Sequence, residues 1–189
     1  MALTALELCT RALLRIGAQA IASMDEGTAE AEIASGLYYG TRDALISSHP
    51  WSFATGQASL PRLASKPSAD FQFAFQLPAG FLRALSAGGP QLGRGVNYRL
   101  FEDRLHCDAD QVTLTYIFLP HESSFPAFFA AALVARLSAE FCIPLTESSP
   151  RAQLLFNQAE NELRAARRAD SQQATTRAID GFPLIRARG

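Results

Sequence analysis

Residues 126–144, PAFFAAALVARLSAEFCIP, carry the strongest structural signal in the chain. The large apolar side chains recur at the three-to-four spacing of a helix and form one broad face, made of Phe128, Phe129, Leu133, Val134, Leu137 and Phe141. We therefore predict a helix that is the most buried in the chain. We expect it to end before Pro144, because a proline ring disrupts the helix that precedes it.

A last long helix is predicted to follow. Thr146 or Ser148 can cap it, and Pro150 suits its first turn. Its sequence becomes more polar toward Arg164–Arg168, so its far half should be solvated or meet a partner. Residues 171–189 have no periodicity but include an apolar cluster, and we expect an extended C-terminal tail there.

Two further helices are predicted before residue 50. Thr4 and Glu7 have the spacing of a capping box, and Gly17 suits the end of the first helix. Thr28 can cap the second helix, which should break at His49-Pro50.

Two glycines, Gly36 and Gly40, lie inside the second predicted helix. A glycine in a helix costs about 1 kcal/mol relative to alanine. We therefore predict that they allow another backbone to approach closely.

The segment between these helix pairs is rich in proline and glycine and predicts strands. The clearest are the alternating Phe71-Phe73-Phe75 run and Val112–Leu119, which is rich in β-branched and aromatic residues. Weaker candidates are Phe53–Leu60, Leu82–Ser86, Tyr98–Phe101 and Arg104–Cys107. Together they predict one small antiparallel sheet.

The predicted fold class is thus α+β, mainly α. Residues 1–50 and 126–170 would form one helical domain, a four-helix core with two N-terminal and two C-terminal helices. Residues 51–125 would be a β-rich insertion, and residues 171–189 the extended tail. At 189 residues the chain is long enough to bury a core of its own.

Composition narrows the function classes. Apolar residues make up 48% and charged residues 19%, which is typical of a globular protein, and the net charge of −1 argues against strongly basic nucleic-acid binding. The three cysteines show no CxxC pair and are interpreted as reduced and buried. Without a signal peptide or a long apolar run, we expect a soluble protein made in the cytoplasm, with no membrane partner.

No motif for chemistry emerges. The run His106-Cys107-Asp108 contains three side chains that can bind metal. Neighbours in a strand point to opposite faces, so these three cannot close on one ion by themselves. Carboxylate pairs that could do glycosidic acid/base work are Asp25-Glu26, Glu102-Asp103 and Asp108-Asp110. We predict no catalytic, cofactor-binding or metal-binding residue. Trp51, at the helix-to-sheet junction, is interpreted as a core residue, and a lock between the helices and the sheet is the alternative role.

A family resemblance rests on three stretches. They are LCTRALLRIGA at residues 8–18 with Ile21 and Ser23 after it, YGTRDAL at 39–45 leading into HPWSFA at 49–54, and FQLPAGFLR at 75–83. These resemble phage head-to-tail connector adaptors, in particular the tail tubular protein A group, and more distantly the adaptors of gene transfer agents. The resemblance covers the first half of the chain and consists of packing motifs.

The resemblance implies a structural, non-enzymatic virion protein that is assembled in the cytoplasm of a bacterial host. Such adaptors form a homo-oligomeric ring, commonly of twelve subunits, in the neck of the particle. The ring joins the portal protein to a stopper or tail protein. DNA passes through its lumen without sequence-specific binding, and no cofactor is implied.

A partner surface for the portal or a neighbouring subunit is predicted near the C-terminus. Its residues are Arg164, Arg167, Arg168, Arg177, Phe182, Leu184, Ile185, Arg186 and Arg188. We hypothesise that residues 180–188 are disordered in the free subunit and order on that partner.

Two alternatives remain open. One is a virion-associated cell-wall hydrolase that uses carboxylates of the β insertion. The other is a small bacterial interaction domain unrelated to any phage.

Overall fold

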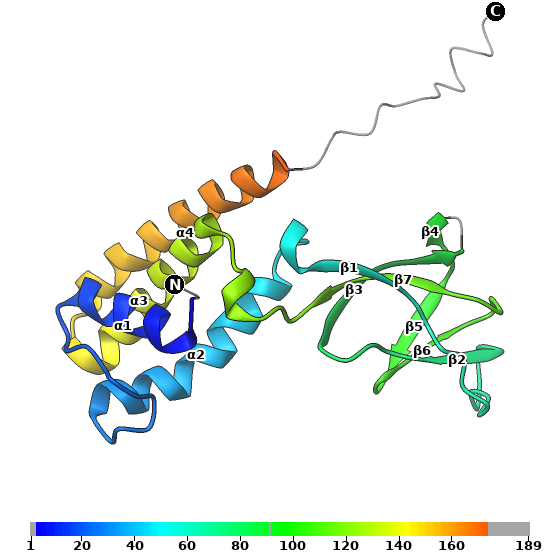
Figure 1. The fold of residues 1–189 in the computed structure, drawn as a ribbon, viewed down its shortest axis with the longest axis horizontal. Helices are drawn as coiled ribbons and strands as arrows, with labels where there is room; N and C mark the ends of the chain where they lie inside the picture. The colour runs from blue at the N-terminus through cyan, green and yellow to red at the C-terminus, as the bar shows by residue number, and fades with distance from the viewer. Residues whose placement is uncertain (1–2, 91, 174–189) are drawn as a thin grey trace, which may run out of the picture.

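The computed structural model describes residues 3–90 and 92–173. The helices are α1 (Ala5–Ile16), α2 (Ala29–Ser47), α3 (Ala127–Thr146) and α4 (Ser149–Ser171), with short 3-10 turns η1 (Ser52–Ala54) and η2 (Glu122–Ser124). The strands are β1 (Thr55–Ser59), β2 (Phe73–Gln76), β3 (Phe81–Gly89), β4 (Leu92–Gly95), β5 (Tyr98–Phe101), β6 (Arg104–Cys107) and β7 (Thr113–Phe118). The predicted mixture of α and β structure is confirmed. The helices gather on one side, here called the helical lobe, and the strands on the other, the β lobe (Figure 1).

Local hydrogen bonds cap the first two helices as predicted. Thr4 and Glu7 form the capping box of α1, and Gly17 ends that helix with a left-handed φ of 76°. The Thr28 side chain accepts from the Ala31 N–H at the start of α2. At α4 the predicted side-chain cap is not formed: Ser148 precedes the helix without a side-chain bond to it, and Pro150 lies in the first turn.

Helix α3 forms the centre of the helical lobe. It packs against α1, α2 and α4, and most of its side chains are buried, including Phe129, Leu133, Leu137 and Phe141. The prediction that this is the most buried helix is confirmed. By length and composition alone α3 could also cross a membrane, but 61% of its most apolar window is buried by the rest of the chain, as in a core helix.

The predicted end of α3 was wrong. The helix continues past Pro144 to Thr146 and ends at Glu147, which has a left-handed φ of 54° and donates its N–H to the Ile143 carbonyl. Pro144 lies in the last turn and is exposed, so its ring has room there. The missing N–H removes one helical bond and leaves the earlier turns intact.

The β lobe contains two antiparallel sheets instead of the single sheet predicted. One has the strand order β1-β7-β3-β4 and the other β2-β6-β5. Strand β2 begins at Phe73, two residues later than the phenylalanine alternation suggested, and β4 was not predicted. β4 lies so close to β3 that a Cβ on Gly88 would overlap the Leu92 carbonyl, which explains the glycine.

The interpretation of the α2 glycines was also wrong for the described chain. A Cβ built on Gly36 or Gly40 meets nothing within 4 Å. No other part of the described chain approaches these glycines, so they border an open space.

Candidate functional site

The junction between the two lobes is built on Trp51, which follows α2. Its side chain is fully buried, and its indole N–H donates to the Leu45 carbonyl over 3.1 Å. The ring meets Phe129 of α3 edge-on, with centroids 5.2 Å apart, and lies near Phe53. These partners belong to α2, η1 and α3, so the interpretation of Trp51 as a core residue is confirmed. Its role in locking the helices to the sheet stays a prediction.

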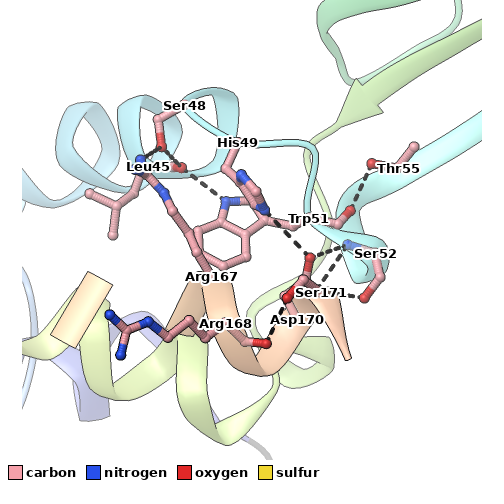
Figure 2. A network of polar contacts seen from close by, with 10 residues as sticks. All are labelled: Leu45, Ser48, His49, Trp51, Ser52, Thr55, Arg167, Arg168, Asp170 and Ser171. Carbon is pink, nitrogen blue, oxygen red and sulfur yellow. Dashed lines mark hydrogen bonds and ion pairs between the residues drawn. The ribbon is translucent and has the colours of Figure 1, made fainter. Parts of the chain in front are cut away.

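A carboxylate from the far end of the chain completes this junction (Figure 2). Asp170, in the last turn of α4, is 4% exposed. Its oxygens accept the Ser52 N–H at 3.0 and 3.1 Å and the Ser52 hydroxyl at 2.6 Å. The carboxylate therefore caps η1 and ties the end of α4 to the chain entering the β lobe.

His49 also faces this carboxylate, with Nε2 3.7 Å from an Asp170 oxygen. Burial lowers the pKa of His49, and the positive charge of Arg167 lowers it further despite the opposing effect of Asp170. We therefore expect a neutral imidazole near pH 7.

The trio of Ser52, His49 and Asp170 contains the residue types of a hydrolytic triad in a different order. In a triad the imidazole lies between the serine and the carboxylate and takes the serine proton. Here the carboxylate lies between the other two, and the Ser52 hydroxyl donates to it. This geometry anchors Ser52 and does not place an imidazole base on its hydroxyl.

A second buried polar cluster ties α2 to η2. Arg42, 8% exposed, donates to Glu122 over 2.7 Å and to Asp43 over 2.8 Å, and the Tyr38 hydroxyl donates to Glu122 over 3.3 Å. Burial alone would raise the pKa of Glu122, but bonds from its own backbone N–H and from Arg42 lower it. Burial and the Glu122 charge raise the pKa of Tyr38. The charges of Arg42 and Glu122 are therefore paired with each other inside the fold.

The open space beside the α2 glycines is a groove of about 550 Å³ between α2 and α4, here called the α2–α4 groove. One wall consists of Gly36, Leu37, Gly40, Thr41, Ala44, Leu45 and Ser48 of α2. The other consists of Glu160, Leu163 and Arg167 of α4, and Arg136 and Glu140 of α3 also line it. Arg136 pairs with Glu140 at 2.8 Å and with Glu160 at 3.6 Å.

Comparisons with known proteins found no match: no protein-family model and no curated protein matches the chain. The site is therefore interpreted from its geometry.

The predicted partner residues on α4 separate into two groups. Arg164 and Arg168 are exposed and make no ion pair with another described residue. Arg167 is half-buried and turns toward α2, where it donates to the Ser48 hydroxyl over 3.4 Å (Figure 2). Its buried Nε has no hydrogen-bond partner among the described residues. A buried donor of this kind costs about 1–3 kcal/mol.

The other six predicted partner residues lie outside the described residues. They are Arg177, Phe182, Leu184, Ile185, Arg186 and Arg188.

The candidate hydrolase carboxylates lie in turns and are exposed. Glu26 accepts the N–H groups of Ala22 and Ser23, and these bonds help to lower its pKa. Asp103 accepts from the Gln76 amide, and Asp108 from the Gln72 N–H.

The cysteines and the run around His106 are the other candidates for reactive or metal-binding groups. Cys9, Cys107 and Cys142 are buried, and burial raises the pKa of Cys9 to about 12. Among the described residues, no three His, Cys, Asp or Glu side chains come together as metal ligands.

Sequence reasoning missed the roles of Asp170, His49, Arg42 and Glu122. One of these roles could have been suspected, because a charged residue on an otherwise apolar helix face needs a partner inside the fold. Arg42 occupies the face that also carries Tyr38 and Leu45, where an unpaired charge would be costly.

Proposed function

We propose that the chain is the subunit of a phage head-to-tail adaptor. Its four helices would form the adaptor core and its β lobe the central insertion. Twelve or so copies would form a ring in the virion neck between the portal protein and the tail or stopper, and DNA would pass through the lumen.

The observation that carries the proposal is the role of residues 49–54, HPWSFA, one of the stretches behind the resemblance. This stretch joins the helical lobe to the β lobe, with Trp51 buried in the helical core and Ser52 bonded to Asp170 of α4. A ring adaptor has to present two different surfaces at a fixed angle, one to its neighbours or the portal and one to the tail. A rigid junction between two lobes supports that role.

The C-terminal half of α4 supplies the partner surface in this proposal. Arg164 and Arg168 are one helical turn apart, so they lie on the same face, and both are exposed. Arginine pairs in two-pronged fashion with carboxylates, which suits an acidic surface on the portal or on a neighbouring subunit. The six C-terminal residues named above would extend this contact.

Electron microscopy of the purified chain, alone and mixed with the portal protein of the same genome, tests the proposal. We expect rings of uniform diameter seated on the portal. Absence of any portal complex would overturn the proposal, and so would release of sugar fragments from purified cell wall by the chain alone.

A charge reversal locates the surface. The double variant R164E/R168E should lose portal or ring binding at moderate salt. The matched control R151E changes an exposed arginine at the opposite end of the same helix and should bind normally. Equal binding by both variants would remove α4 from the contact.

A further inference from the structure

We propose that, in the free subunit, the α2–α4 groove binds the chain's own C-terminal segment, residues 179–185. This sequence, IDGFPLI, is the apolar part of the chain beyond the described residues. The inference concerns the isolated chain and does not depend on ring assembly.

The first support is where the described chain ends. Helices α2 and α4 run in the same direction along α3 (Figure 1), and the bond from Arg167 to Ser48 marks one end of the groove. The described chain stops at Gln173, about 9 Å of helix rise beyond Arg167. The described chain therefore ends about 9 Å beyond this end of the groove.

The second support is length. From Gly36 to Ser48 the groove follows about 18 Å of α2. Residues 174–178 can span up to about 17 Å and bring the chain back to Ser48, and residues 179–185 in extended form cover about 20 Å. The apolar segment thus matches the groove in length when it runs antiparallel to α2.

The third support is the shape and chemistry of the wall. Gly36 and Gly40 lie one turn apart with open space where their side chains would be. A backbone can come close to α2 at these positions, and a large side chain such as that of Phe182 fits beside them. Leu37, 36% exposed, and Leu163 of α4 supply apolar contact.

The fourth support is charge. A segment that runs back along α2 would bring Arg186 and Arg188 to the end of the groove near Gly36. Glu160 lines that end, where it also pairs with Arg136 at 3.6 Å, and Glu32 lies one turn before Gly36 on the same face of α2. Glu32 is exposed and makes no ion pair with another described residue.

The buried Nε of Arg167 gives the fifth support. It is a donor with no partner in the described chain, at the end of the groove where the segment would enter. A backbone carbonyl of the entering segment would satisfy it. The groove would then hold the segment by both apolar and polar contacts.

Such docking would cover the apolar side chains of the C-terminal segment in the free subunit. The free subunit would keep the apolar residues Phe182, Leu184 and Ile185 covered, and a partner would have to displace them. This differs from the sequence-based hypothesis, in which residues 180–188 have no fixed place until a partner binds.

Cysteine crosslinking tests the proposal directly. The full chain with G40C and G181C, oxidised at low protein concentration, should form a disulfide within one chain, seen as faster migration on a non-reducing gel. The native cysteines are buried and should not interfere. The matched control pairs G181C with Q158C on the opposite, exposed face of α4, and should crosslink weakly.

Three results of the crosslinking experiment would overturn the proposal. Equal crosslinking of the two pairs, or none, would overturn docking in the groove. A dimer-sized product from G40C/G181C would show that the segment binds a second copy and would overturn docking within one chain. Portal binding of the unmodified chain is measured separately, so failure here is distinguishable from failure of the proposed function.

Thiol labelling provides a second measurement. An effective concentration of about 1 mM and an affinity of about 0.1 mM for so short a segment predict about tenfold slower labelling of G40C in the full chain than in a chain ending at Gln173. The double variant F182D/L184D in the full chain should label as fast as the shortened chain. Unchanged rates in both would contradict the proposal.

Discussion

The helical lobe and the β lobe differ in how each closes its core. The helical lobe surrounds α3 with three helices, and its buried cluster includes Trp51, Phe129 and Phe141. The β lobe has two small sheets over a smaller buried cluster around Phe75 and Leu105. Both lobes leave some large apolar side chains substantially exposed, such as Leu14 and Leu154 in the helical lobe and Leu92 in the β lobe.

This difference indicates which lobe contributes more to the stability of the fold. Strand β7 reaches into the helical core through Ile117, and the chain enters the β lobe directly after Trp51. The β lobe is thus supported from the helical side, and its open strands are the part that should unfold first. The predictions below test this order.

The largest effect is expected for W51A. Removing a fully buried indole leaves a cavity and takes away one of the donors to the Leu45 carbonyl, which keeps its bonds from Ser48. The free energy of unfolding should therefore fall by about 3–5 kcal/mol. Urea unfolding followed by circular dichroism measures it, with L154A at an exposed site as control. A loss below about 1 kcal/mol would show that the lobes are not joined through Trp51.

The next effect separates the lobes. F75A removes the largest buried side chain of the β-lobe cluster and should cost about 3 kcal/mol there. Hydrogen exchange should speed up in β2, β5 and β6 while α3 stays protected. If α3 loses protection equally, the two lobes unfold as one unit.

A smaller effect is expected for E122Q, which removes the charge facing Arg42. The Arg42 side chain is 9% exposed and keeps Asp43, so the cost should be about 1–2 kcal/mol. E140Q is the matched control. It weakens the more exposed Arg136 pair and should cost less than about 0.5 kcal/mol. Equal losses would mean that burial of the Arg42 cluster adds nothing.

The double variant G36A/G40A should stabilise the chain. Both positions are helical with open space for a methyl group, so each replacement should add about 0.5–1 kcal/mol to the free energy of unfolding. Thermal unfolding of a chain ending at Gln173 measures this without the C-terminal segment. A loss of stability there would place an unseen packing partner on the glycines.

The smallest expected effect is a pH dependence that arises from His49. Because its pKa is lowered in the fold, the unfolded chain takes up the proton first as pH falls below about 6.5, and stability decreases in that window. H49Q should flatten the slope of stability against pH between about 7 and 5.5. The charges that face this imidazole are Arg167, Asp170 and Arg83. An unchanged slope would show that His49 does not cause the dependence.

Much of the site could not be predicted from the sequence, although parts of it could. Trp51 was predicted to be buried because a single large ring beside a helix break is most often a core residue, and it is buried. Asp170 had no such sign, because its partner Ser52 is 118 residues away and both are common surface types. The Gly36 and Gly40 pair was noticed, but its surroundings were wrong, since spacing along a helix does not tell what lies opposite it.

Short-range patterns were enough to predict the starts of α1 and α2, because caps such as Thr4 with Glu7 join groups only three residues apart. The broad apolar face of α3 was enough to predict that this helix is buried. The division into two sheets, the Asp170 clamp and the groove beside α2 became visible only in the folded chain. Each depends on segments distant in the chain whose mutual positions follow from packing of the whole core.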